Sequence, residues 1–133
     1  MAYLDFTEMP AWQLAAEVVK EVYDLSALLP RSEDYALRGQ VREAAIGMTG
    51  NIAEGFGRLY GKDKTNFYLY ARGSSYEVRS HLLVGHKVGY FTLDAISSIN
   101  AKCLKVVEEL NKIIKNLSST PSGSSNKNST AQP

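Results

Sequence analysis

The chain has 133 residues, enough for one domain, and its 15 Lys and Arg residues nearly balance 14 Asp and Glu residues, so a net charge of +1 points to no class of partner. A single cysteine excludes an intramolecular disulfide and a multi-cysteine metal site, and two histidines leave few ligands for a metal. Because no stretch reaches the roughly 18 uninterrupted apolar residues of a membrane span, we expect a cytoplasmic protein that is neither secreted nor inserted in a membrane.

The first predicted helix covers residues 7 to 30. Thr7 is its expected cap, Pro10 stands in the first turn, where a missing amide costs nothing, and Pro30 ends the helix. Apolar residues recur within it at intervals of three and four, which predicts that one side faces a core. These core residues are Leu14, Val18, Val22 and Leu25.

The second predicted helix follows the cap residue Ser32, has acidic residues at its positive end and runs to about Leu59. Its expected core residues are Leu37, Val41, Ala44, Ala45, Met48, Ile52 and Phe56. The third runs from about Asp63 to Gly89, and its expected core residues are Phe67, Ala71, Ser74, Val78, Leu82 and Gly85. The fourth follows the cap residue Thr92, and its expected core residues are Ile96, Ile99, Cys103, Val106, Leu110, Ile114 and Leu117.

This pattern predicts an all-α protein, because no segment alternates with period two for long enough to form a strand. Four long helices joined by short connections favour an antiparallel up-down four-helix bundle, which we expect to occupy residues 1 to 117. Residues 118 to 133 read SSTPSGSSNKNSTAQP and contain no aromatic residue, no large aliphatic residue and no acid. Such a segment cannot bury enough apolar area to offset its ordering entropy, so we expect a disordered tail.

Large apolar residues also occur on the sides of the helices that face away from the predicted core. On the third helix they recur at intervals of seven, and on the second helix glycines occupy the outward side. A mid-helix glycine costs about 0.8 to 1 kcal/mol relative to alanine, and the close approach of another helix would compensate this cost. We therefore predict a head-to-tail subunit interface that closes into a ring; the alternative is a broad intramolecular core. The candidate interface residues are Trp12, Val19, Tyr23, Gly50, Gly57, Leu69, Tyr76 and Leu83.

Charge is distributed unevenly along the chain. Residues 1 to 33 hold six acidic and two basic residues, whereas residues 34 to 90 hold five acidic and eight basic residues. The hairpin of the second and third helices is therefore a candidate surface for RNA or DNA. The same cations could equally stay solvated, pair with the acidic first helix of a neighbouring subunit, or recognise an acidic protein. They are Arg38, Arg42, Arg58, Lys62, Lys64, Arg72, Arg79 and Lys87.

The most distinctive stretch is QVREAAIGMTGNIAEGFGR over residues 40 to 58, preceded by AWQLAAEVVKEVY and followed by FYLYARGSSYEV. Together these segments resemble the bacterial four helix bundle family, also known as ribosomal RNA intervening-sequence proteins. A more distant relative is the accessory protein of diversity-generating retroelements, which binds nucleic acid. The resemblance implies a small four-helix protein, a homopentamer as in some members, and no enzymatic activity. The residues at the family's signature positions are Asn51, Glu54, Gly55, Arg58, Gly73, Ser74 and Glu77.

Two contacts follow from helical spacing within this motif. Glu54 and Arg58 are four residues apart and can form an ion pair worth about 0.3 to 0.5 kcal/mol if exposed. In an antiparallel hairpin that turns near Gly61, Asn51 comes to lie near Ser74. We therefore predict a polar lock that fixes the register of the second and third helices, with a ligand site as the alternative.

Other reactive residue types form no recognisable site. Glu77 and His81 have no second Glu-His pair to complete a di-iron centre, and Cys103 falls on a core stripe. We therefore expect no metal, no cofactor and no catalytic residue. The sequence favours a non-enzymatic homo-oligomeric scaffold or accessory protein with possible contact to RNA or DNA; the alternative is a protein-interaction module that binds an acidic protein.

Overall fold

The computed structural model describes residues 3–119, which contain four α-helices and two short 3-10 helices. The α-helices are α1 (Pro10–Ser26), α2 (Leu37–Gly57), α3 (Gly61–Lys87) and α4 (Leu93–Ser119), and the 3-10 helices are η1 (Phe6–Glu8) and η2 (Arg31–Glu33). No strand occurs between residues 3 and 119, which confirms the all-α prediction for this part of the chain. The predicted tail lies outside the described residues, except that residues 118 and 119 continue α4.

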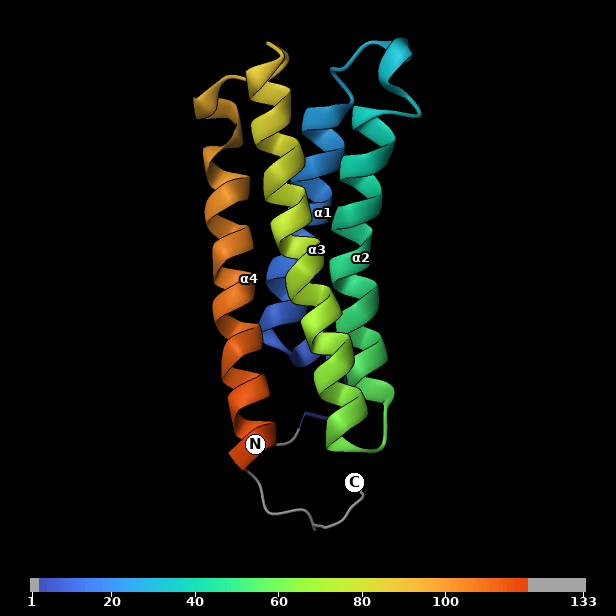
Figure 1. Ribbon diagram of the computed structural model, residues 1–133, viewed down its shortest axis with the longest axis vertical. Helices are drawn as coiled ribbons and strands as arrows, with labels where there is room; N and C mark the ends of the chain where they lie inside the picture. Colours follow the sequence, from blue (N-terminus) through green and yellow to red (C-terminus); the bar gives the residue numbers. More distant parts are fainter. Residues whose placement is uncertain (1–2, 120–133) are drawn as a thin grey trace.

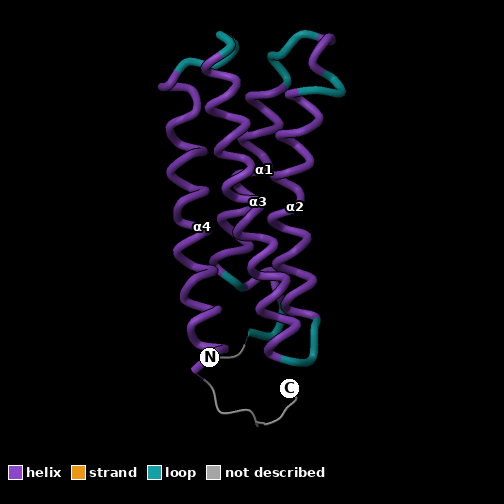
Figure 2. The backbone as a smooth tube through the Cα atoms, viewed as in Figure 1, coloured by secondary structure: helices purple, strands orange, loops and turns teal. Residues whose placement is uncertain are grey.

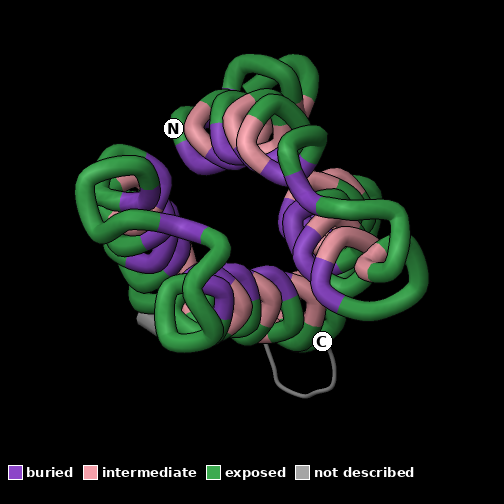
Figure 3. Tube along the Cα trace, turned by 90° about the horizontal axis from the view of Figure 1, so that it is seen from above, coloured by how far each residue is buried: buried purple, intermediate pink, exposed green. Residues whose placement is uncertain are grey.

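The helices run alternately up and down, as predicted (Figure 1). α1 lies beside α2 and α4, and α3 lies beside the same two helices, so α1 and α3 stand diagonally across the bundle (Figure 3). The contact between α2 and α3 is the most extensive of these. We call the end that holds the α2–α3 turn, the start of α1 and the end of α4 the turn end, and the opposite end the loop end (Figure 2).

Two predicted helix starts are wrong. Thr7 does not cap α1: its hydroxyl donates to Asp5, its backbone N–H does the same at 3.3 Å, and Thr7 lies inside η1. α1 begins instead at Pro10, after Met9, with no side-chain cap. α2 begins five residues after Ser32, because η2 intervenes and the Glu33 carboxylate accepts the Leu37 N–H at 3.0 Å.

The other two starts are closer to the prediction. The Thr92 hydroxyl accepts the Ala95 N–H at 3.1 Å and caps α4, as expected. α3 begins at Gly61, two residues earlier than predicted. A side chain accepts an early backbone N–H at α2 and at α4, whereas α1 and α3 begin without a side-chain cap. Of the two caps, residue type predicted only the one from Thr92.

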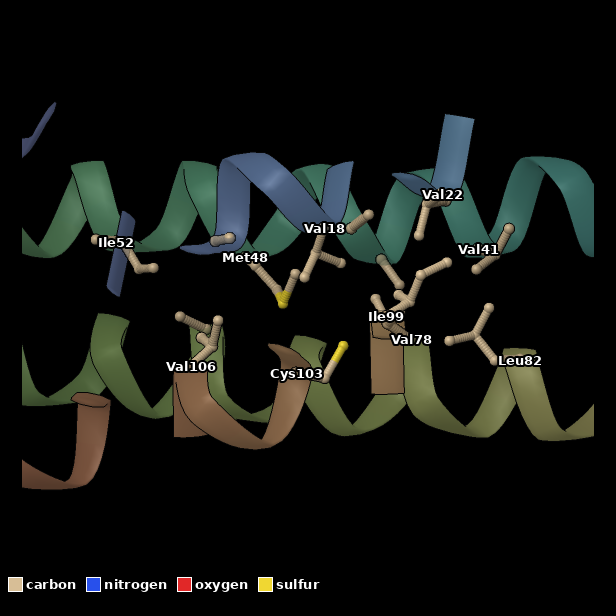
Figure 4. Packing of buried hydrophobic residues seen from close by; sticks show 14 of the residues in the cluster. Val18, Val22, Val41, Met48, Ile52, Val78, Leu82, Ile99, Cys103 and Val106 are labelled. Carbon is tan, nitrogen blue, oxygen red and sulfur yellow. The ribbon is translucent and has the colours of Figure 1, made fainter. Parts of the chain in front are cut away.

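The core is an apolar column between the four helices (Figure 4). The predicted stripes of α2 and α4 are buried or half-buried along their full length. On α1 the predicted Val18 and Val22 are buried, but Ala11, Ala15 and Ser26 also lie inside, while the predicted Leu14 and Leu25 are only half-buried. The core therefore contains small side chains of α1 that were not predicted to be buried.

On α3 four of the six predicted core residues are buried, namely Ala71, Val78, Leu82 and Gly85. Tyr68 and Ser75 are buried in place of the predicted Phe67 and Ser74. The Ser75 hydroxyl donates to the Cys103 carbonyl at 2.8 Å, so its polar atom is satisfied inside the core. The Tyr68 ring packs directly against Gly55 of α2. A Cβ atom at position 55 would lie only 2.7 Å from this ring, so the close packing requires glycine there.

Candidate functional site

The outer face of α3 carries two of the eight predicted interface residues, Tyr76 and Leu83. We define this outer α3 face by Tyr76, Ser80, Leu83, Val84 and Lys87, which together with Arg79 line a shallow, open depression of about 430 Å³. Tyr76, Leu83 and Val84 are 48%, 42% and 48% exposed. Three large apolar side chains therefore face outward on one helix within the described chain, an arrangement typical of a contact surface.

The remaining predicted interface residues divide into two groups. Trp12 and Val19 are half-buried against the core, and Trp12 makes an edge-to-face contact with Phe6 at 5.4 Å. Leu69 is also half-buried, whereas Tyr23 is exposed beneath the Arg42 guanidinium, 4.3 Å from the ring centroid. The broad-core alternative therefore accounts for much of the surface of Trp12, Val19 and Leu69, but not for the outer α3 face.

The outward glycines leave open space beside α2. A side chain at Gly50 or Gly57 would meet nothing within 4 Å, and the same is true of Gly73 on α3. Gly47 differs, because a side chain there would begin 3.0 Å from the Ser74 hydroxyl. Packing within one chain thus accounts for glycine at position 47 but not at positions 50, 57 and 73.

Most of the predicted basic surface is bound within the chain. Arg38 donates to the carbonyls of Ser26, Leu29 and Pro30 and pairs with Asp34, so it closes the C-terminal end of α1. Arg42 adds bonds to the Ser26 hydroxyl at 2.8 Å and the Tyr23 carbonyl at 3.2 Å. Cations at a helix C-terminus complement its dipole, which explains why two arginines are used there.

Three further cations hold helices together. Arg72 and Arg79 donate to Asn111 and Asn100 at 2.8 and 2.9 Å, which ties α3 to α4. Lys64 donates to the last carbonyls of α2, as described below. Of the eight predicted cations, Lys62 and Lys87 are exposed and have no partner within residues 3–119, so they are the members of this set most available to a ligand.

A cluster of basic and aromatic residues lies at the turn end. We define this turn cluster by Arg58, Tyr60, Lys62, Phe67 and Tyr70. The Arg58 guanidinium lies 4.6 Å from the Phe67 ring centroid, and Phe67 packs edge-to-face on Tyr70 at 5.6 Å. Tyr60 and Tyr70 are 52% and 58% exposed. The turn cluster thus presents aromatic faces beside cations. Its cations Arg58 and Lys62 were predicted from the sequence, but its aromatic residues were not.

The signature residues do not form the predicted polar lock. Asn51 donates to the Gly47 carbonyl of its own helix at 2.9 Å, and among the described residues Ser74 makes no hydrogen bond. α2 and α3 are registered instead by close packing, at Gly47 against Ser74 and at Gly55 against Tyr68. The Asn51 side chain thus forms its hydrogen bond within its own helix and makes none to α3.

Two ion pairs accompany this packing. The predicted Glu54–Arg58 pair is present, at 3.0 Å, with both side chains about half exposed. Glu77 lies 3.7 Å from His81, whose Nε2 is buried without a hydrogen-bond partner in the described structure. The exposed Glu54–Arg58 pair contributes little to stability, as surface ion pairs generally do.

A metal centre requires metal-ligand side chains grouped together, and a cysteine nucleophile requires a reactive thiolate. Across residues 3–119, no group of three or more His, Cys, Asp or Glu side chains is placed to hold a metal ion. Cys103 is buried, and burial raises the pKa of its thiol to about 11, which disfavours the nucleophilic thiolate at neutral pH.

Comparison with known proteins agrees with this arrangement. The family model for the 23S rRNA-intervening sequence protein matches residues 7–112. A protein of unknown function from the S23 ribosomal protein family of Bacteroides thetaiotaomicron has a similar fold, with a TM-score of 0.72 and 20% sequence identity, over 79% of this chain and 98% of that chain. At this identity the likeness shows the fold alone. No curated protein matches the sequence.

Proposed function

This chain belongs to the 23S rRNA-intervening sequence protein family, and we propose that it is a non-enzymatic scaffold or accessory protein that assembles with copies of itself. The observation that carries the proposal is the outer α3 face, where Tyr76, Leu83 and Val84 are each more than two-fifths exposed. Covering such a face removes apolar area from water at roughly 25 cal/mol per Å². A second copy of the chain is a partner that is always available.

The assembly that we propose is a closed ring. The apolar side chains lie on α3 and the open positions Gly50 and Gly57 lie on α2, so the contact joins two different surfaces. Head-to-tail contacts of this kind close into rings or continue as fibres. The sequence resemblance described above makes five the expected number of subunits, with residues 1–117 as the assembling domain.

Light scattering on Leu83→Glu tests this proposal. We expect the variant to fall to the mass of one chain, 14.7 kDa, while its far-UV circular dichroism stays helical. Leu104→Glu is the matched control, because Leu104 is 44% exposed on α4 and Leu83 is 42% exposed on α3. A wild-type monomer, or equal loss of assembly in both variants, would contradict the proposed contact surface.

Contact with RNA or DNA is a second proposed function, and the turn cluster is the observation that favours it. Proteins bind single strands by stacking bases on aromatic side chains beside cations. Tyr60 and Tyr70 offer exposed rings, and Lys62 has no internal partner within the described chain. The family's name also links its members to sequences inserted in 23S ribosomal RNA. The cations on the rest of α2 and α3 support this function less, because most of them bind their own chain.

Binding to a single-stranded RNA at several salt concentrations tests the second function. We expect Tyr70→Ala to weaken binding by about tenfold, and the affinity to fall as salt rises. Tyr35→Ala is the control, since Tyr35 is 98% exposed at the loop end, away from the turn cluster. Absence of binding to RNA and DNA at low salt, with recovery of an acidic protein instead, would favour the protein-interaction alternative.

The proposed place of action is the cytoplasm. Among residues 3–119, none of the helices combines the length and the apolar character needed to cross a membrane. A ribosomal RNA partner would also be met in that compartment. Fractionation of cells that express a tagged chain tests the assignment, and recovery with the membrane fraction would contradict it.

A further inference from the structure

A pocket opens at the turn end of the bundle, and none of the residues that define the outer α3 face or the turn cluster lines it. The segment before α1, the end of α2, the start of α3 and the end of α4 enclose about 640 Å³ there. This volume lies within the range of small-molecule sites. Met9, Phe56, Ile113 and Leu117 supply apolar walls from three of the four segments that surround it.

Two side chains of α3 bring hydrogen-bond donors to this pocket. Lys64 Nζ donates to the carbonyls of Gly55 and Phe56, at 3.2 and 2.8 Å, which uses two of its three N–H groups. Tyr68 is only 3% exposed, and its hydroxyl makes no hydrogen bond within residues 3–119. Lys64 and Tyr68 are four residues apart and therefore lie on the same side of α3.

Burial affects both groups. It lowers the pKa of the Lys64 ammonium and raises the pKa of Tyr68 to about 12, so the phenol stays protonated and able to donate at neutral pH. Each group keeps donor capacity for a ligand oxygen, because Lys64 has one N–H left over and the Tyr68 hydroxyl has no acceptor among the described residues. The pocket therefore offers two donors to the oxygen of a ligand.

The charges around the pocket favour an anion. Glu109 is compensated by Lys112, whose Nζ lies 3.0 Å from the carboxylate. Lys64 has only neutral carbonyls as its hydrogen-bond partners, so its positive charge has no ion-pair partner among the described residues. We propose that this pocket binds a small apolar acid, with its hydrocarbon part between Phe56, Ile113 and Leu117 and its carboxylate on Lys64 and Tyr68.

Octanoate is the probe that tests the site, and 1-octanol is its neutral counterpart. We expect calorimetry to detect octanoate binding, and nuclear magnetic resonance shifts to centre on Ile113 and Tyr68. Lys64→Met should weaken octanoate binding by about tenfold, because a charge-assisted hydrogen bond is lost, and should leave octanol binding nearly unchanged. Lys62→Met is the matched control, two residues away and exposed, and should bind octanoate like the parent chain.

Two further variants keep the inference testable if Lys64→Met unfolds. Tyr68→Phe removes only the hydroxyl and should weaken octanoate binding severalfold, and Ile113→Trp should fill the pocket and abolish binding. Binding that persists in the Leu83→Glu chain would support a site independent of self-association. No octanoate binding, equal affinity for octanol, or shifts confined to the outer α3 face would overturn the assignment.

Discussion

α3 and α4 have the same length, 27 residues, but differ in what they present to their surroundings. α4 places its large apolar residues on one side, with Leu93 and Leu104 as the exposed exceptions. α3 buries a comparable stripe and also exposes Tyr70, Tyr76, Leu83 and Val84. A helix like α4 completes its packing within one chain, whereas α3 has apolar area left over. This difference locates the surface on which a partner is expected.

The largest expected effect comes from the inner sides, where the two helices should behave alike. Leu82→Ala on α3 and Leu110→Ala on α4 each empty a fully buried site. We expect each to lower the free energy of unfolding by about 3 kcal/mol, as cavities in close-packed cores do. Urea denaturation followed by circular dichroism measures this. A loss under 1 kcal/mol in one helix alone would show that the two inner sides are not equivalent.

Alkaline pH should reveal a second inner feature, on α4. Burial raises the pKa of the Cys103 thiol from 9.0 to about 11, so the neutral thiol is favoured in the folded state. Stability is therefore full below pH 9 and falls by about 2 kcal/mol as pH rises to 11. Cys103→Ala should remove this part of the decline in urea denaturation. Tyr68 contributes in the same direction, toward a pKa of about 12, so a smaller decline should persist in the variant.

The ties between the two helices should have a smaller effect. Arg79→Met removes the hydrogen bond to Asn100, which is 2.9 Å long in the folded chain. We expect a loss of about 1 kcal/mol in thermal or urea unfolding. Lys87→Met changes a cation on the same helix with no partner in the described chain, and should alter stability by less than about 0.5 kcal/mol. Equal losses would show that the Arg79 contact adds nothing.

The outer sides should produce the smallest change in stability and the clearest contrast between the helices. Val84 on α3 and Leu104 on α4 are 48% and 44% exposed. Val84→Ser and Leu104→Ser should each stay within about 0.5 kcal/mol of the parent chain in unfolding experiments on dissociated material. Only Val84→Ser should weaken self-association in analytical ultracentrifugation. Weaker association in Leu104→Ser alone would move the contact surface to α4.

The sequence predicted much of the fold because long apolar stripes leave few alternatives. The stripes on α2 and α4 were predicted correctly, whereas on α1 and α3 the prediction was correct at most positions and one residue off at Leu14, Leu25, Phe67 and Ser74. Ala15 and Ser75 are small enough to be overlooked, yet they occupy the inner positions. The hydrophobic periodicity of the sequence is dominated by large apolar residues, whereas small residues are also buried where two helices approach closely.

The candidate site was harder to predict, since residue type does not reveal a partner. Arg38 and Lys62 carry the same charge, but Arg38 binds three carbonyls of its own chain while Lys62 faces outward. The pocket at the turn end is formed by segments from both ends of the sequence, which no local pattern connects. The exposure of Tyr76 and Leu83 could be anticipated because these residues repeat along a single helix, and the Glu54–Arg58 pair because its members are four residues apart.

The order of helices around the bundle has a consequence for synthesis of the chain. Each helix lies beside its neighbours in sequence, and α1 also lies beside α4. During translation α2 and α3 can pair into their extensive hairpin early, because their contacts are local. The open side between α1 and α3 can be covered only once α4 has left the ribosome. Until then the nascent hairpin presents Ile52, Val78 and Leu82 to its surroundings, which makes that stage the one most in need of protection by a chaperone.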